Sequence, residues 1–187
     1  MSEILKVGKL RNGLSYILNP NKNFNSCCIY IYIRVGSKHE KPTEYGMAHF
    51  LEHILFKGTK KYKTNIELNK KIDSITGYTN ASTAKNYTNY FLKLPFNNLE
   101  EGLDLLKEMV FCSLLNEKEL EKEKDVVLEE MNKTFDDSED FIEDLLPYYI
   151  FKDSNLSHYI LDIKEKIKNM KRKDILKFYK KYYIPSN

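Results

Sequence analysis

The chain opens with the residue pattern of β-strands. Asn12-Gly13 is a strong signal for a two-residue hairpin turn. The run CIYIYIRV that follows is rich in β-branched and aromatic side chains, so it predicts a central strand ending at Gly36. The predicted strands are residues 7–11, 14–18, 28–35, 78–83 and 87–94.

The remaining apolar residues recur mostly at helical spacing. Residues 46–56 are apolar on all sides, which is the pattern of a helix buried in a core. Residues 98–115 carry one apolar stripe, made of Leu99, Leu103, Leu106, Val110 and Leu114. The predicted helices are residues 46–56, 66–75, 98–115, 117–135, 141–150 and 173–182.

This order of elements predicts the fold class. Strands come first, then helices, then a strand pair and then helices, which is typical of an α+β fold with a mainly antiparallel sheet and helices packed on one side. The length of 187 residues suits a single domain. The chain stops soon after Ile184, where another strand could begin, so we expect a domain over residues 1–187 that is truncated before its last strand.

Composition and charge narrow the function classes. The net charge is only +3, and acidic and basic residues are interspersed, so a nucleic-acid partner gets no support. No stretch approaches the roughly 18 to 20 apolar residues that a membrane helix needs. The N-terminus lacks a signal-peptide pattern, and three cysteines do not form a disulfide framework. We therefore expect a cytoplasmic protein with no membrane partner.

The main chemical signal is the segment His49-Phe50-Leu51-Glu52-His53. In a helix, residues four apart lie on one face, so His49 and His53 can direct ring nitrogens at one metal ion. Glu52 falls between them and can hold a metal-bound water. This is the H-x-x-E-H spacing, the reverse of the commoner H-E-x-x-H.

The competing interpretation treats these three as ordinary surface residues. Their neighbours make the helix apolar all round, so an ionised Glu52 and two imidazoles would be buried there without partners. That burial would cost several kcal/mol, and a bound metal removes the cost. The surroundings of the motif therefore favour a metal site.

A catalytic zinc usually has three protein ligands, and segment 117–135 offers the third. Its apolar stripe is made of Leu120, Val127 and Met131. Glu123 and Glu130, seven residues apart, share an edge of this stripe, whereas Glu129 points to the solvated face. Glu130 is therefore the better ligand candidate, and Glu123 is expected to act as a second catalytic carboxylate that orients a ligand or the water.

The chain resembles the N-terminal domain of the pitrilysin/insulinase family of zinc peptidases, in particular the β-type processing peptidases of mitochondria. The segment GMAHFLEHILFKGT at residues 46–59 matches the metal helix of that family almost letter for letter. The other similar segments are residues 35–40, 80–83 (NAST), 88–90 (TNY), 123–131 and 178–187.

The resemblance implies a half-barrel-like α/β sandwich, bound Zn²⁺ and peptide-bond hydrolysis. It places the third ligand at Glu130. It also implies that Asn80 and Ala81 lie on an edge strand that pairs with the substrate backbone, and Phe50 is expected to contact substrate too. The family adds a second homologous domain or subunit, which is not located here. Leu161-Asp162 stands where the family often has a glycine.

The sequence therefore predicts a zinc-dependent metalloendopeptidase domain that acts on peptides or unfolded segments. His49, His53 and Glu130 would hold the metal, and Glu52 would take a proton from the water. The alternative is a peptide-binding or scaffold subunit that does not cut, but such subunits tend to lose the metal set that this chain keeps. Expected partners are a peptide and the second half; a homodimer is a further expectation, because the zinc face would be open.

Overall fold

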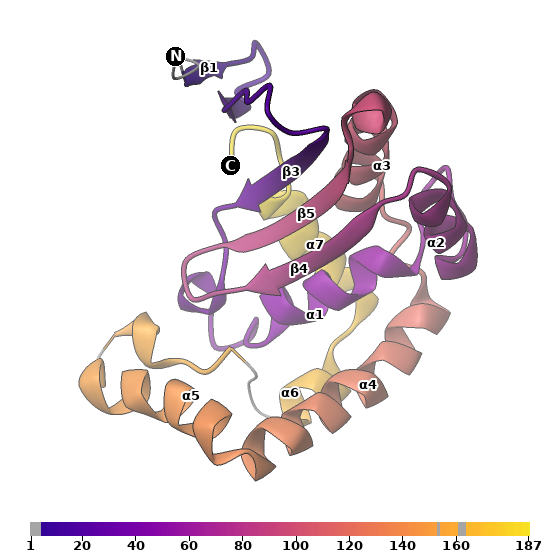
Figure 1. Cartoon of the computed structure of the whole chain (residues 1–187). Helices are drawn as coiled ribbons and strands as arrows, with labels where there is room; N and C mark the ends of the chain where they lie inside the picture. The colour runs from indigo at the N-terminus through magenta and orange to yellow at the C-terminus, as the bar shows by residue number, and fades with distance from the viewer. Residues whose placement is uncertain (1–4, 153, 161–163) are drawn as a thin grey trace.

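The computed structural model describes residues 5–152, 154–160 and 164–187, so Leu161-Asp162 lies outside the described residues. An antiparallel sheet has the strand order β3-β5-β4, made of β3 (Ser26–Ile33), β5 (Thr88–Pro95) and β4 (Tyr78–Thr83). A separate hairpin, β1 (Lys6–Lys9) with β2 (Ser15–Leu18), stands at the edge of the molecule (Figure 1).

The hairpin pairs as predicted, but its turn is longer. The register runs from Lys6 opposite Leu18 to Lys9 opposite Ser15, so residues 10–14 form the connection. Gly13 has a φ of 92°, and its amide donates to the Leu10 carbonyl at 3.0 Å. The two-residue turn is therefore wrong, although the Asn-Gly signal marked the position of the reversal correctly.

The order of the sheet corrects a second expectation. Among the described residues β3 is an edge strand, and β5 occupies the centre. Burial along β3 alternates, with Tyr30 and Tyr32 exposed, whereas β5 is buried over most of its length. The tyrosines of β3 favour strand structure, but they do so on a surface that is half solvated, which composition alone does not reveal.

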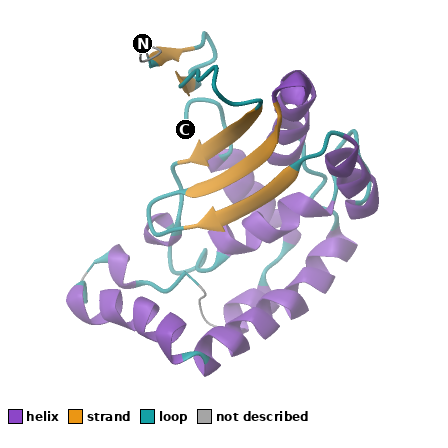
Figure 2. Cartoon of the chain, viewed as in Figure 1, coloured by secondary structure: helices purple, strands orange, loops and turns teal. Residues whose placement is uncertain are grey.

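Helices cover the face of the sheet opposite to the exposed tyrosines of β3, in agreement with the predicted α+β class (Figure 2). α1 contacts β4 and β5, α3 contacts β5 and β3, and α7 packs against α1. α4 contacts α1, α5 and α6, and α5 lies away from the sheet (Figure 1). Their bounds are α1 (Met47–Ile54), α2 (Asn65–Ser74), α3 (Leu99–Phe111), α4 (Glu117–Asp136), α5 (Ser138–Ile150), α6 (Lys164–Asn169) and α7 (Arg172–Tyr182).

The buried face of α3 differs from the predicted stripe. The helix ends at Phe111, and Leu103 is 49% exposed. Its buried positions are Gly102, Leu105, Leu106, Met109 and Val110. A Cβ atom at position 102 would lie 2.5 Å from Leu94 Cδ1, so the glycine lets α3 approach β5 closely and sets which face turns inward.

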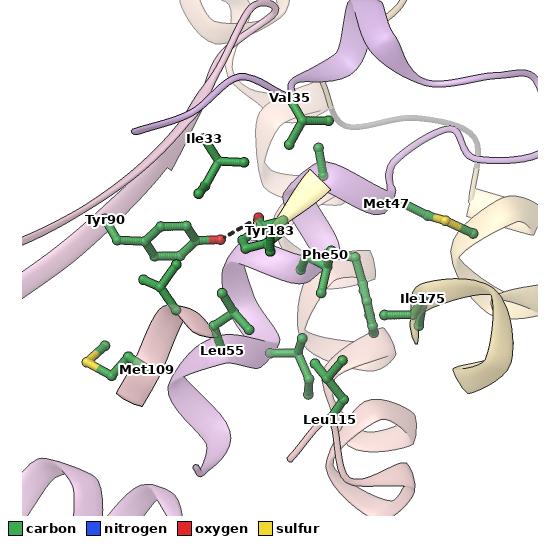
Figure 3. Packing of buried hydrophobic residues seen from close by; sticks show 14 of the residues in the cluster. Ile33, Val35, Met47, Phe50, Leu55, Tyr90, Met109, Leu115, Ile175 and Tyr183 are labelled. Atoms are coloured by element: carbon green, nitrogen blue, oxygen red, sulfur yellow. Dashed lines mark hydrogen bonds between the residues drawn. The ribbon is translucent and has the colours of Figure 1, made fainter. Parts of the chain in front are cut away.

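The hydrophobic core lies between the sheet and the helices (Figure 3). Phe50, Leu51 and Leu55 lie at its centre and are fully buried. Tyr90 and Tyr183, also buried, satisfy each other through a hydrogen bond of 2.8 Å between their hydroxyls. Among the described residues, no helix combines the length and apolarity that crossing a bilayer requires.

Candidate metal centre

The start of α1 is fixed by a buried carboxylate. Glu40 is 2% exposed, and its two oxygens accept from the amide of Gly46 at 2.8 Å and from that of Ala48 at 2.6 Å. The first amides of a helix have no partner within it, and a negative charge there is favourable. Glu40 therefore sets where α1 begins, although sequence reasoning did not single it out.

α1 and α4 bring the three predicted ligands together. His53 Nε2 lies 3.1 Å from Glu130 Oε2, and His49 Nε2 lies 3.7 Å from Glu130 Oε1. One ligand atom from each residue lies within 4.8 Å of the others. Among the described residues, this is the one trio of His, Cys, Asp or Glu side chains that meets such a criterion.

These distances fit a zinc ion. Ligands in tetrahedral geometry, each about 2.1 Å from zinc, stand about 3.4 Å apart. The two contacts, one to each oxygen of Glu130, lie on either side of that separation. Two imidazoles and one carboxylate are also a common ligand set of catalytic zinc.

The orientation of α4 agrees with the face that helical spacing predicts. Glu130 is half-buried and turned toward α1, whereas Glu129 next to it is exposed. Glu123 lies two turns earlier on the same side and is 4% exposed. The structure therefore brings Glu123 and Glu130 to the histidines and leaves Glu129 in solvent.

Glu123 contacts a predicted ligand rather than joining the trio. Its Oε1 lies 3.0 Å from His53 Nδ1, and its Oε2 lies 2.6 Å from Lys57 Nζ. Burial acts to raise the pKa of Glu123, but hydrogen bonds from His53 and Lys57 outweigh it and lower the pKa. An ionised carboxylate only accepts, so His53 donates from Nδ1 and presents Nε2 to Glu130.

The two histidines titrate in opposite directions. Burial, together with the charge of His53, lowers the pKa of His49 to about 4. Burial acts the same way on His53, but hydrogen bonds to Glu123 and Glu130 outweigh it and raise its pKa to about 9. The same hydrogen bond from His53 lowers the pKa of Glu130. Without metal, a proton on His53 therefore balances part of the negative charge of Glu123 and Glu130.

Glu52 is held from the sheet side. Its Oε2 accepts a hydrogen bond of 2.6 Å from Thr83 Oγ1 on β4. Burial raises the pKa of Glu52, and the hydrogen bond from Thr83 opposes the rise only in part. In the sequence, Thr83 stands out only as the last residue of the NAST segment. The alternation along β4 turns residues 79, 81 and 83 toward α1, and this alternation is the signal by which Thr83 could be found.

β4 ends the sheet on the side of α1, as expected for an edge strand. Asn80 is exposed, and Ala81 is partly buried against the core. The Ala81 amide donates to Asn80 Oδ1 at 2.9 Å, a local bond rather than a rung of the ladder with β5. This amide therefore marks the outer side of β4.

Phe50 does not reach this surface. Its side chain is fully buried in the core under the sheet (Figure 3). The next residue after a ligand in a helix points about 100° away from it, here into the apolar side of α1. The expected contact between Phe50 and substrate is therefore wrong for this structure.

Comparison with known proteins places these features in a family. Residues 16–163 match the profile described as insulinase (Peptidase family M16). The uncharacterized zinc protease YmxG of Bacillus subtilis is 36% identical over 175 residues, which cover 94% of this chain and 42% of that protein. The mitochondrial-processing peptidase subunit beta of Rattus norvegicus is 32% identical over 174 residues, covering 93% of this chain and 35% of that one.

A solved structure shows the same fold. The first half of the periplasmic protease PqqL from Escherichia coli superposes with a TM-score of 0.88 at 26% identity, over 98% of this chain and 41% of that chain. The chain thus spans less than half the length of these relatives.

Proposed function

The chain belongs to the insulinase family of peptidases (peptidase family M16), and we propose from this premise that it is the zinc-binding, catalytic half of a metalloendopeptidase. The observation that carries the proposal is the trio His49, His53 and Glu130, with Glu52 on the same helix beside it. The donor set and its spacing fit zinc, and relatives are named zinc proteases.

His49, His53 and Glu130 would hold the ion. Zinc, when bound, would supply Lewis acidity that polarises a carbonyl and lowers the pKa of water to about 7. Glu52 would act as the general base that takes the proton from this water and passes it to the leaving amine. Its raised pKa suits that role, because a base works best when its pKa lies near the operating pH.

The substrate would bind as a strand added to β4. A peptide backbone at this edge would take over the Ala81 amide and displace the side chain of Asn80. Thr83, two residues further along β4, holds Glu52. The strand that we assign to substrate binding therefore also orients the proposed base, which would place a scissile bond beside the metal.

A second half would complete the site. Relatives are more than twice as long as this chain, and one of them is named as a subunit. Peptide hydrolysis needs the substrate held beside the metal, and misplacement by about 1 Å can cost on the order of a hundredfold in rate. We expect the chain alone to fold but to be nearly inactive, and its open face to favour self-association. A scaffold subunit that binds peptides without cutting would not need the intact trio with Glu52.

The test compares Glu52→Gln with Glu129→Gln in this chain combined with the second half, on an unfolded protein substrate. Glu52→Gln should keep zinc and lose about a hundredfold or more in turnover, because an amide cannot accept the proton. Glu129→Gln removes an equal charge from the exposed face of α4 and should leave turnover unchanged. A Glu52→Gln enzyme as active as the wild type would refute the assignment of the base.

A further inference from the structure

Lys57 contacts Glu123, the carboxylate that holds the proposed ligand His53, and has no part in the chemistry above. It follows α1 in a short 3-10 helix (Leu55–Lys57), and its Nζ lies 2.6 Å from Glu123 Oε2. The Glu123 side chain is 5% exposed and that of Lys57 27%, so the pair is largely shielded from water.

The backbone around Lys57 is fixed. Gly58 has a φ of 141°, and a Cβ at this position would lie 2.6 Å from the Lys63 carbonyl oxygen. Asn65 Nδ2 donates to the carbonyl of Phe56 at 2.9 Å. The turn after α1 is therefore tightly constrained, and it aims Lys57 back toward α4.

Attraction to the metal gives no reason for a lysine here. A cation near a bound dication repels it, so Lys57 by itself should weaken metal binding. The contact between Lys57 and Glu123 instead explains the lysine by the orientation of the Glu123 carboxylate. His53 engages only one oxygen of Glu123, and a buried carboxylate held at one oxygen can rotate about its terminal bond. The contact with Lys57 holds the second oxygen and fixes the plane of the carboxylate.

We propose that Lys57 is a positioning residue for the metal centre: it clamps Glu123, which in turn orients the His53 ring so that Nε2 faces His49 and Glu130. The inference rests on the proposed function, because it assumes that the trio binds zinc. Loss of an outer partner of a metal ligand typically weakens metal binding about 10–100-fold. If Lys57 acts by positioning, its removal should weaken zinc binding. If Lys57 acts only by charge repulsion, its removal should strengthen zinc binding.

The experiment measures zinc affinity of the chain by competition with a chromophoric chelator at fixed pH, so no peptidase activity is needed. Lys57→Met keeps the apolar stem but removes the charge. It should bind zinc about 10–100-fold more weakly, and the visible spectrum of its cobalt(II) form should change. Lys57→Arg, which can reach the same carboxylate, should recover most of the affinity. Lys60→Met removes an exposed charge three residues on and should have no effect.

Thermal melting in chelator checks that each variant folds, and Lys57→Gln replaces Lys57→Met if the latter does not. Lys57→Met that binds zinc as tightly as the wild type, or more tightly, overturns the role of Lys57 while leaving the proposed function in place. A folded wild-type chain that binds no zinc overturns both.

Discussion

The two sides of α1 are built on different physical principles. One side buries Phe50, Leu51 and Ile54 in the core, where each is at most 1% exposed. The other side carries Glu52 and His53 against β4 and α4, where their partners are a hydroxyl and two carboxylates.

The difference shows which side stabilises the fold. Burial of a large apolar side chain stabilises by about 1.5–3 kcal/mol. Buried charges lose solvation, and a buried ion pair often contributes no net stability compared with apolar residues of the same size. The polar side of α1 is therefore poorly explained by stability and well explained by a metal.

The largest effect on folding should come from the apolar side. Phe50→Ala should lower the free energy of unfolding by about 3–5 kcal/mol, because it leaves a cavity in a closely packed core. Phe96→Ala, at a site that is 57% exposed, should change it by less than about 0.5 kcal/mol. Urea denaturation in chelator measures both. Equal effects would mean that α1 is not packed as described.

The next effect separates two adjacent glutamates on α4. Glu130→Gln should weaken zinc binding by more than about a hundredfold, since it removes a proposed ligand rather than an outer partner. Glu129→Gln should leave the affinity unchanged, because Glu129 is exposed. The readout is chelator competition. An exchange of the two outcomes would show that the face of α4 is wrongly assigned.

A smaller effect is expected where the polar side meets the sheet. In the chain combined with its second half, Thr83→Val removes the hydroxyl that donates to Glu52 and should lower kcat about tenfold, the value of one hydrogen bond to a charged group. Thr83→Ser should retain most of the turnover, and zinc content should not change in either variant. A valine variant with wild-type kcat would deny Thr83 any part in orienting the base.

The smallest effect is a pH dependence of the zinc-free protein. The pKa of His53 is raised to about 9, so its contribution to stability is complete below pH 6.5 and is lost as the pH rises through 9. The free energy of unfolding should fall by less than about 1.4 kcal/mol per pH unit. Below pH 6.5 the trend reverses, because the pKa of His49 is lowered to about 4 and the unfolded chain binds that proton more strongly.

Urea midpoints measured in chelator between pH 5 and pH 9 should therefore peak near pH 6.5. In His53→Asn the decline above pH 6.5 should disappear. A decline that persists in this variant would assign the pH dependence to other groups.

Sequence patterns predicted the features that depend on local spacing. The apolar surroundings of residues 46–56 indicated a buried helix, and the period of 3.6 residues separated Glu130 from Glu129. Contacts between distant segments could not be predicted this way. Thr83 meets Glu52 across 31 positions, and Lys57 meets Glu123 across 66, so neither pair leaves a local pattern.

The errors have a similar origin. Phe50 is expected to contact substrate, whereas its direction in the helix turns it into the core. The composition of β3 predicts a central strand, but composition does not encode strand order, and β3 lies at an edge of the sheet. The second half and the cytoplasmic location stay predictions.

The zinc content of the purified chain after dialysis tests the proposed metal centre most directly. We expect about one zinc per wild-type chain, because three convergent side chains form one site. The double variant His49→Ala, His53→Ala should hold almost none, while its melting temperature in chelator shows that it is folded. A folded double variant that retains one zinc per chain would contradict the assignment of the metal centre.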